Sequence, residues 1–395
     1  SIKCHHNDVA DYIKENLMSD RYDREEVLSA ILQFHNYNYF PDNFVGIYDF
    51  FYLSFYKYNS LSKLSLKNTS NLNDIQNLYC SLLQRKEIIS ECFKGYQNLE
   101  KIAIPSSIKY IGNSAFKECY YLKQISIPNS VTSICKKAFQ FCSELMQVTI
   151  PYSVTSIEEE TFGHCSNLAQ IIIPSSVTSI GKESFYCCSN LYKVTIPHSV
   201  TYIGDNAFEG CTSLVKINIP HSLTYIGGGL FKGCESIAKI TIPSSIKSIG
   251  DDAFYDCKLL KELKIPSSVI SIGKKAFYGC SSLMHITIPS SLKSIGEDAF
   301  CGCSLLAHIV IPSSIKSIRY GVFCRCTSLE QIEIPSSVKT IGSNAFYECT
   351  SLIQIVIPSS ITSIRNGVFY RCTSLTQIII PSSVASIGDK AFYGC

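Results

Sequence analysis

Apolar and polar positions recur along the chain with a fixed step of 23 residues, from Leu99 to Cys395. In each repeat an isoleucine stands directly before a proline. A serine, a second isoleucine, a phenylalanine and a cysteine then follow that proline at constant distances. The unit reads Leu-x-x-Ile-x-Ile-Pro-x-Ser-Val-x-Ser-Ile-Gly-x-x-Ala-Phe-x-x-Cys-x-x. A strict period in this range, free of insertions, predicts a solenoid of thirteen stacked coils.

Each unit contains one strand-like and one turn-like segment. Residues 124–127 alternate between polar and isoleucine positions, which predicts a short strand with one buried face. Pro128 has no N–H and should end the pairing, and Gly181 and its equivalents should permit a bend at the next corner. The segment Ala-Phe-x-x-Cys-x-x-Leu has helix-like spacing but allows only a turn or two. We therefore expect short extended and turn segments here, and no full helices.

Stacking is needed because a single coil cannot bury its own apolar side. Leucine, isoleucine, valine, phenylalanine and cysteine positions should each meet their equivalents one coil away. Adjacent coils are expected roughly 4.8 Å apart, so that thirteen of them would span on the order of 60 Å.

The unit resembles that of the leucine-rich repeat class, and specifically its BspA-like subtype, whose repeat has the form Leu-x-x-Ile-x-Ile-Pro-x-Ser-Val-x-x-Ile-Gly-x-x-Ala-Phe-x-x-Cys. The resemblance covers about three quarters of the chain, residues 99–395. It implies a β-rich, curved solenoid with parallel strands on the concave face and short turns or extended segments on the convex face. It also implies a surface antigen or adhesin, at the cell surface or secreted, that binds host or neighbouring-cell proteins.

The first 98 residues differ from the repeats, because they hold 17 of the 45 aromatic residues and a formal charge of 10 − 12 = −2. Apolar residues at helical spacing and a capping pair at Asp23 and Glu26 predict a helical N-terminal domain over residues 1–73. Ile88 and Phe93 match the isoleucine and phenylalanine positions of the repeat. Residues 74–98 are therefore expected to form a degenerate capping repeat.

Charge and hydropathy exclude several classes of protein. The chain has 35 basic and 32 acidic side chains, and a net charge of +3 makes no case for binding nucleic acid. No run approaches the ~18 apolar residues of a membrane helix, so no membrane insertion of this chain is expected. The N-terminal residues show no apolar signal-peptide core, which leaves a cytoplasmic location as the alternative.

Thirteen of the 20 cysteines lie on the repeat, always 14 residues after the proline. One cysteine per coil would have to pair with alternate neighbours, so small buried thiols explain this column better than disulfides. Cys301 and Cys324 are different, because they occupy one off-column slot in adjacent coils. Their Cα atoms should be close enough for a disulfide, which would form only in an oxidising compartment. Otherwise the two thiols simply pack.

No catalytic or metal chemistry is predicted. His285 aligns with His308 and His198 with His221, but no carboxylate or thiol column joins either pair to complete a metal site. The serines form a structural column, and no Gly-x-Ser-x-Gly motif occurs. We expect neither an enzyme nor a bound cofactor.

Two surfaces could hold a partner. The first has lysines four residues after the proline, at 293, 316 and 339, with Arg319, Arg325, Arg365 and Arg371 nearby. These cations could attract acidic glycans or phosphates, or they could simply keep the surface solvated.

The outward positions of the predicted strands carry more weight, because they form a flat and partly apolar row of the kind through which solenoids bind. High β-propensity alone would also select such residues. The candidate binding face consists of Ile172, Thr195, Thr241, Thr287, Val310, Glu333, Val356, Ile379, Gln331, Gln354 and Gln377. The predicted function is non-enzymatic binding of proteins, as an adhesin or, alternatively, as an intracellular scaffold for protein–protein interaction.

Overall fold

The structure is a computed structural model that describes residues 86–395, all of which belong to one compact unit, Lys67–Cys395. The predicted helical domain, 1–73, and the first part of the predicted capping repeat, residues 74–85 of 74–98, lie outside the described residues. Both therefore stay predictions.

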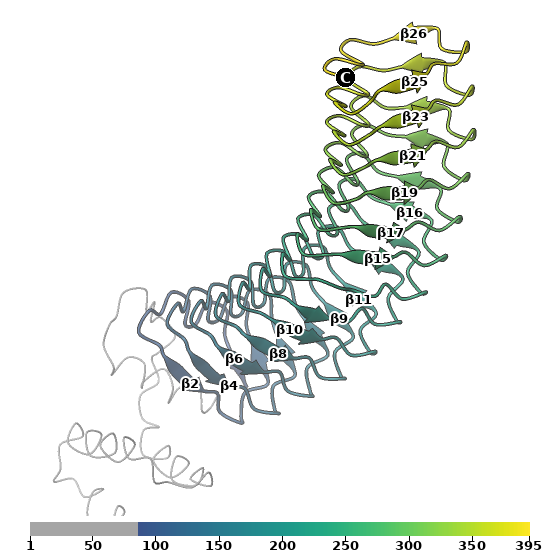
Figure 1. Cartoon of the computed structure of the whole chain (residues 1–395). Helices are drawn as coiled ribbons and strands as arrows, with labels where there is room; N and C mark the ends of the chain where they lie inside the picture. The colour runs from purple at the N-terminus through teal and green to yellow at the C-terminus, as the bar shows by residue number, and fades with distance from the viewer. Residues whose placement is uncertain (1–85) are drawn as a thin grey trace, which may run out of the picture. The chain divides into compact units, whose positions relative to one another are not determined.

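Residues 86–395 form a solenoid of stacked coils, most of which carry two short strands, and these strands form two parallel rows (Figure 1). The first row consists of β2 (Lys101–Ala103), β4 (Gln124–Ser126), β6 (Gln147–Thr149), β8 (Gln170–Ile172), β10 (Lys193–Thr195), β12 (Lys216–Ile217), β15 (Glu262–Lys264), β17 (His285–Thr287), β19 (His308–Val310), β21 (Gln331–Glu333), β23 (Gln354–Val356) and β25 (Gln377–Ile379).

The second row follows the proline turn. It consists of β1 (Glu87–Ile88), β3 (Tyr110–Ile111), β5 (Ser133–Ile134), β7 (Ser156–Ile157), β9 (Ser179–Ile180), β11 (Tyr202–Ile203), β13 (Tyr225–Ile226), β14 (Ser248–Ile249), β16 (Ser271–Ile272), β18 (Ser294–Ile295), β20 (Ser317–Ile318), β22 (Thr340–Ile341), β24 (Ser363–Ile364) and β26 (Ser386–Ile387).

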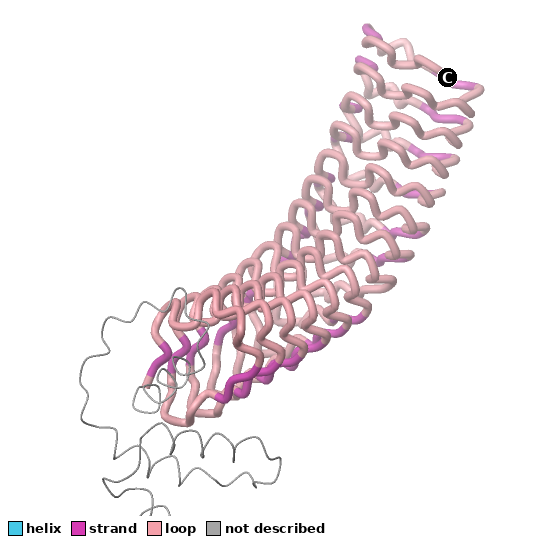
Figure 2. Tube along the Cα trace, turned by 90° about the vertical axis from the view of Figure 1, so that its left-hand side faces the viewer, coloured by secondary structure: helices cyan, strands magenta, loops and turns pink. Residues whose placement is uncertain are grey.

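All strand pairs are parallel and join residues 23 positions apart, as Ile102 with Ile125 or Ile332 with Ile355. The remaining backbone consists of turns and bends, and residues 86–395 contain no helix (Figure 2). The predicted parallel solenoid with short turn segments is thus confirmed for the described residues. The location of the first row on the concave side stays a prediction.

The core is built from columns of identical side chains. Phe93 and its equivalents through Phe369 are fully buried, and consecutive rings stack with centroids 4.9–6.1 Å apart. Ile88 pairs with Ile111, and Phe93 stacks on Phe116, so residues 86–98 continue these columns into the coil that precedes the one with Pro105. Such rings contribute dispersion contacts and a large buried apolar area.

The cysteine column forms a second continuous ladder, as the sequence predicts. Each of its thirteen thiols donates a hydrogen bond to the carbonyl oxygen of the phenylalanine 26 residues earlier, at 3.0–3.2 Å. The thiols therefore satisfy backbone acceptors that would otherwise be buried without a partner. All described cysteines are free.

The serine two residues after the proline has a similar role in nine of the thirteen coils. The hydroxyl of Ser199 donates to the carbonyl oxygen of Val177 at 2.6 Å, and that of Ser176 donates to Val154 at 2.7 Å. Because the acceptor lies in the preceding coil, this column also joins neighbouring coils.

Glycine recurs at the corner after the second isoleucine for a different reason from the predicted bend. A Cβ on Gly273 would lie 2.4 Å from the carbonyl carbon of Gly250, and the backbone of Gly273 is not left-handed. Close approach of neighbouring coils therefore favours glycine here. The left-handed bends fall on other positions, such as Gly279 with φ +70° and Asp298 with φ 54°.

Candidate binding face

We use the term strand face for the outward side chains two and four residues before each proline, on and beside the first row of strands. All eleven predicted residues are exposed there. The buried isoleucine or valine between each outward pair, such as Ile332 in β21, holds the strand against the core. The alternation of the sequence is thus converted into one flat outer surface.

Seven of the eleven residues form a single patch on β19, β21, β23 and β25. Residues Val310, Glu333, Val356 and Ile379 align in register, and so do Gln331, Gln354 and Gln377. We call these seven residues the C-terminal patch.

Exposed apolar side chains dominate the C-terminal patch. Val310 is 78% exposed, Val356 64% and Ile379 62%, although residues of this type are usually buried. Glu333 lies between the two valines and is the only charged side chain of the patch. The surface therefore offers apolar contacts and amide hydrogen bonds around a single carboxylate.

The other four predicted residues lie apart from this patch. Ile172, which is 74% exposed, pairs with Thr195 in the sheet β12-β10-β8-β6-β4-β2. Thr287 lies in the separate two-stranded sheet β15-β17, and Thr241 lies outside the named strands.

Asn218 marks the interruption between these sheets. Its side chain accepts a hydrogen bond from the amide of Ile196 at 2.9 Å and donates one to the carbonyl oxygen of Ile196 at 2.8 Å. The side chain thereby provides the acceptor and the donor that the backbone of a paired strand would provide. Between β12 and β15 the first row contains only one isolated bridge, which joins Lys239 and Glu262. The strand face is consequently divided into segments.

A third outward column was missed by the sequence analysis. The residue five positions before the proline is exposed in most coils, and in several it is a large apolar residue: Met146, Tyr192, Val215, Met284 and Ile353. Backbone bonds such as that from the amide of Val215 to the carbonyl oxygen of Tyr192, at 3.0 Å, extend the ladder by one residue. The sequence could have indicated this column, because each of these residues directly follows the buried leucine of its repeat.

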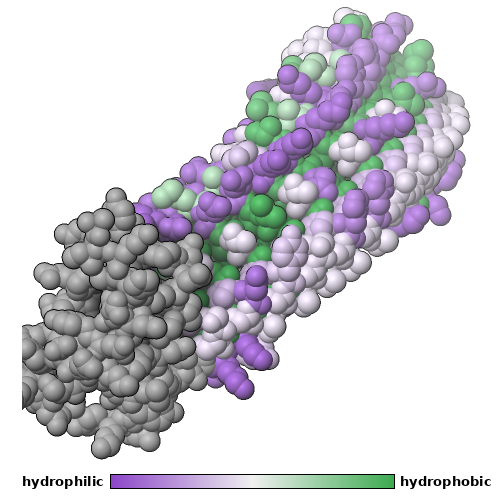
Figure 3. Space-filling model, turned by 90° about the horizontal axis from the view of Figure 1, so that it is seen from below, coloured by the Kyte–Doolittle hydropathy of each residue, from purple (hydrophilic) through white to green (hydrophobic). Residues whose placement is uncertain are grey.

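Hydrophobic surface is continuous over part of the solenoid. Figure 3 shows hydrophobic side chains gathered in a band along the stacked coils, bordered by hydrophilic ones. Bands of exposed apolar surface are typical of interaction sites.

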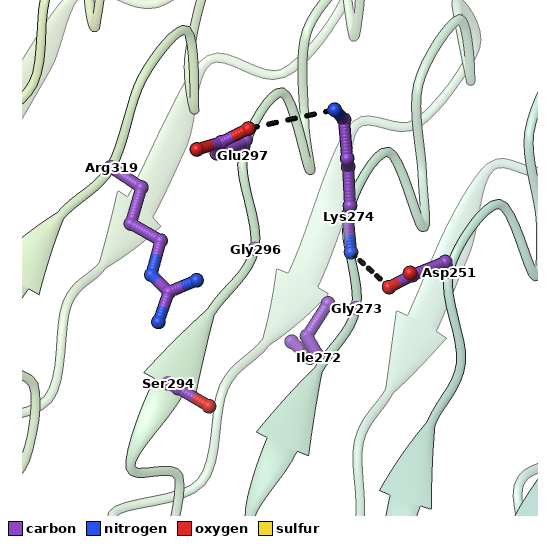
Figure 4. Close-up of a pocket in the computed structure, with 8 residues that line it drawn as sticks. All are labelled: Asp251, Ile272, Gly273, Lys274, Ser294, Gly296, Glu297 and Arg319. Atoms are coloured by element: carbon purple, nitrogen blue, oxygen red, sulfur yellow. Dashed lines mark hydrogen bonds and ion pairs between the residues drawn. The ribbon is translucent and has the colours of Figure 1, made fainter.

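The structure contains a shallow polar pocket beside the second row of strands, of about 290 Å³ (Figure 4). Asp251 accepts a hydrogen bond from the amide of Lys274 at 2.7 Å, and the Lys274 ammonium pairs with Glu297 at 3.5 Å. Ser294 and Arg319 complete one side of it. Since its polar groups largely satisfy each other, the pocket has the character of a polar surface groove.

The side chains weighed as candidates for metal or redox chemistry do not assemble into a metal site. Among residues 86–395 no group of three or more His, Cys, Asp or Glu side chains is placed to hold a metal ion. Burial raises the pKa of the ladder thiols, that of Cys119 to about 12, so that they stay protonated and poorly nucleophilic.

Cys301 and Cys324 lie in adjacent coils, joined by a backbone hydrogen bond of 2.7 Å from the amide of Gly302 to the carbonyl oxygen of Cys324. Both are free thiols. The thiol of Cys301 donates to that of Cys324, and this bond, with the nearby Arg325 guanidinium, lowers the pKa of Cys324. The pair therefore differs electrostatically from the buried ladder.

The part of the chain that the structure describes has no helix of the length and apolarity needed to cross a membrane.

Comparison with known proteins identifies the repeat. The family model for the BspA type leucine rich repeat region (6 copies) matches residues 86–215, 178–307 and 293–395. These matches cover the whole of the described chain. No curated protein matches the sequence.

Solved structures of bacterial leucine-rich repeat proteins share both sequence and fold with the chain. A leucine-rich repeat protein from Bacteroides ovatus is 34% identical, with 75% of this chain and 84% of that chain covered and a TM-score of 0.65. A leucine rich cell surface protein from Faecalibacterium prausnitzii is 32% identical over 74% of this chain and 82% of that chain, with a TM-score of 0.51.

The pneumococcal vaccine antigen PcpA shares the fold at 20% identity, with 76% of this chain and 86% of that chain covered and a TM-score of 0.53. Neither the family description nor these three structures names an enzymatic activity. The unbroken repeat, the parallel solenoid and the match over residues 86–395 together make this chain a member of the BspA-type leucine-rich repeat family.

Proposed function

We propose that this protein is an adhesin that binds proteins of a host or of neighbouring cells through the C-terminal patch of its strand face. The observation that carries the proposal is the in-register stack of Val310, Val356 and Ile379, all strongly exposed, around the carboxylate of Glu333. The leucine-rich repeat fold itself favours binding of proteins.

The chemistry of the patch supports a protein partner. Apolar side chains on a rigid flat surface bury area without losing much conformational freedom, because β-branched residues are restricted at χ1 before they bind. The three glutamine amides of the patch can donate and accept hydrogen bonds at the rim of a contact. Such a mixture is typical of protein interfaces.

A location at the cell surface follows from the same proposal. The related protein from Faecalibacterium prausnitzii is described as a cell surface protein. Antibodies against the chain should therefore stain intact cells of the source organism. Staining that requires permeabilised cells would instead support the intracellular scaffold.

Adhesion can be measured with microspheres coated with the full chain and added to cultured epithelial cells. The triple variant Val310→Thr, Val356→Thr and Ile379→Thr removes apolar surface but keeps β-branched side chains. We expect at least about tenfold weaker adhesion, equivalent to about 1.4 kcal/mol. Treatment of the cells with trypsin should abolish adhesion of the wild-type beads.

A matched control tests whether the position of the apolar residues matters. Met146→Thr, Ile172→Thr and Val215→Thr remove three exposed apolar side chains from the other end of the solenoid, one on the strand face and two in the column beside it. This variant should keep adhesion within about twofold of wild type. Equal losses in both triple variants, or adhesion that survives trypsin, would contradict the proposed site or the proposed protein partner.

A further inference from the structure

Five exposed cations lie on the second row of strands in four consecutive coils. We call Lys293, Lys316, Arg319, Lys339 and Arg365 the cationic stripe. Lys316 and Arg319 flank β20, and the amide of Lys339 donates to the carbonyl oxygen of Lys316 at 2.9 Å. That bond places two lysines of the stripe directly above one another in neighbouring coils.

The five cations of the stripe have no acidic partners. Several other lysines of the solenoid do pair with acids one coil away, as Lys258 with Glu235 at 2.6 Å and Lys239 with Glu262 at 2.8 Å, although some, such as Lys193, are unpaired as well. The stripe is distinguished by having five unpaired cations on one row of strands in four consecutive coils. Within residues 86–395 no ion pair joins any of the five cations of the stripe to an acid. Glu297, the acid beside Arg319 in the pocket of Figure 4, pairs with Lys274 instead.

Unpaired like charges in register on neighbouring strands destabilise a sheet. Three lysines of the stripe recur at the same position of consecutive coils, with a spacing of roughly 4.8 Å set by strand pairing. A ligand with negative groups along its length would relieve this repulsion. The stripe is therefore complementary to a linear anion that runs along the solenoid.

We propose that the cationic stripe binds an acidic polysaccharide, in which carboxylate or sulfate groups are separated by uncharged sugar hydroxyls. The surroundings favour this class of ligand. The adjoining pocket presents the Ser294 hydroxyl and the carboxylates of Asp251 and Glu297, which can accept hydrogen bonds from hydroxyl groups but repel anions.

Those same carboxylates disfavour a nucleic acid, whose duplex carries one charge per ~1.7 Å of axis. The net charge of +3 agrees, since surfaces that bind nucleic acid are usually strongly basic overall. A sparsely charged polymer suits five cations spread over four coils better than a densely charged one. This site lies on a different row of strands from the proposed protein-binding patch and does not depend on it.

The test measures binding of the full chain to immobilised chondroitin sulfate and hyaluronan in ~0.15 M salt, where long-range charge effects are screened beyond ~8 Å. Wild type should bind at least one of the two polysaccharides. The triple variant Lys293→Gln, Lys316→Gln and Lys339→Gln should bind at least about tenfold more weakly, with a lower dependence of affinity on salt. Arg319→Gln with Arg365→Gln should weaken binding in the same direction.

The matched control removes three exposed and unpaired lysines on and beside the strand face, Lys193→Gln, Lys216→Gln and Lys261→Gln. Its binding should stay within about twofold of wild type, and unfolding temperatures should confirm that all variants fold. The proposal is overturned if wild type binds neither polysaccharide or if the control loses as much affinity as the stripe variant. Tighter binding of a single-stranded oligothymidylate or of polyglutamate would also overturn it, in favour of a nucleic acid or an acidic protein.

Discussion

The Sγ atom of Cys257 donates a hydrogen bond to the carbonyl oxygen of Phe231, in the preceding coil, at 3.2 Å. Both residues belong to columns that run through the solenoid, and both side chains are fully buried. The cysteine therefore has two roles, filling a small apolar space and satisfying a backbone acceptor of its neighbour.

Replacement of Cys257 by alanine should lower the free energy of unfolding by about 1–3 kcal/mol, because the Phe231 carbonyl loses its partner in a buried place. Urea titration followed by circular dichroism measures the change. Cys135→Ala, at a half-buried cysteine outside the column, should change stability by less than about 0.5 kcal/mol. Equal effects of the two substitutions would argue against the role of the thiol as a donor.

Stability should decline at alkaline pH because of the same column. Burial raises the pKa of the ladder thiols, that of Cys372 to about 12, whereas an unfolded thiol titrates near ~8.5. Their contribution is therefore complete below about pH 8 and is lost as the pH rises, by about 1.4 kcal/mol per pH unit for each thiol.

Tyrosines and lysines also titrate in this range, so the informative quantity is a difference between two proteins. Between about pH 9 and pH 11 the free energy of unfolding of Cys257→Ala should fall less steeply with pH than that of wild type. The difference in slope should correspond to about one proton released on unfolding. Urea titrations at several pH values test this. Parallel curves for both proteins would show that the Cys257 thiol does not contribute to the pH dependence.

Two serines of one column provide a matched pair. The hydroxyl of Ser199 donates to Val177 at 2.6 Å, whereas the buried hydroxyl of Ser268 has no partner. Ser199→Ala should destabilise the protein by about 1 kcal/mol, and Ser268→Ala should be neutral or stabilising. Thermal or urea unfolding of the two variants gives the comparison, and a reversed order would contradict this assignment.

Cys324 should be the most reactive of the half-buried thiols. The hydrogen bond from Cys301 and the Arg325 guanidinium lower the pKa of Cys324, while burial raises the pKa of Cys187. Iodoacetamide at neutral pH should therefore alkylate Cys324 faster than Cys187, as followed by peptide mass spectrometry. Arg325→Gln should slow the reaction at Cys324 and leave Cys187 unchanged. Similar rates at both thiols would contradict the electrostatic argument.

Much of the fold could be predicted because the repeat is strict. The alternation in residues 124–127 predicts β4 and its buried face, and the strand pairs join equivalent residues 23 positions apart. The spacing of the cysteines predicts a ladder of buried thiols, which the structure contains. All eleven residues of the predicted binding face are indeed outward and exposed.

Other features depend on single departures from the repeat, which a period cannot reveal. Asn218 occupies an outward position like any other, yet its amide replaces backbone pairing and helps to divide the strand face. The exposed column with Met146 and Val215 was missed because it lies one residue outside the predicted strand. The glycine column was explained by a bend, whereas Gly273 is needed for close approach of two coils.

The sequence by itself determined the coil: its length, its buried columns and the face of each strand, because a strict period imposes the same environment on every equivalent residue. Tertiary structure alone decided which groups are satisfied across coils. The acceptor of Cys257 lies 26 residues away, and the cations of the stripe lack acids that several other lysines have. Hydrogen bonds and ion pairs depend on distances of a few ångströms between stacked coils, and only the packed solenoid sets those distances.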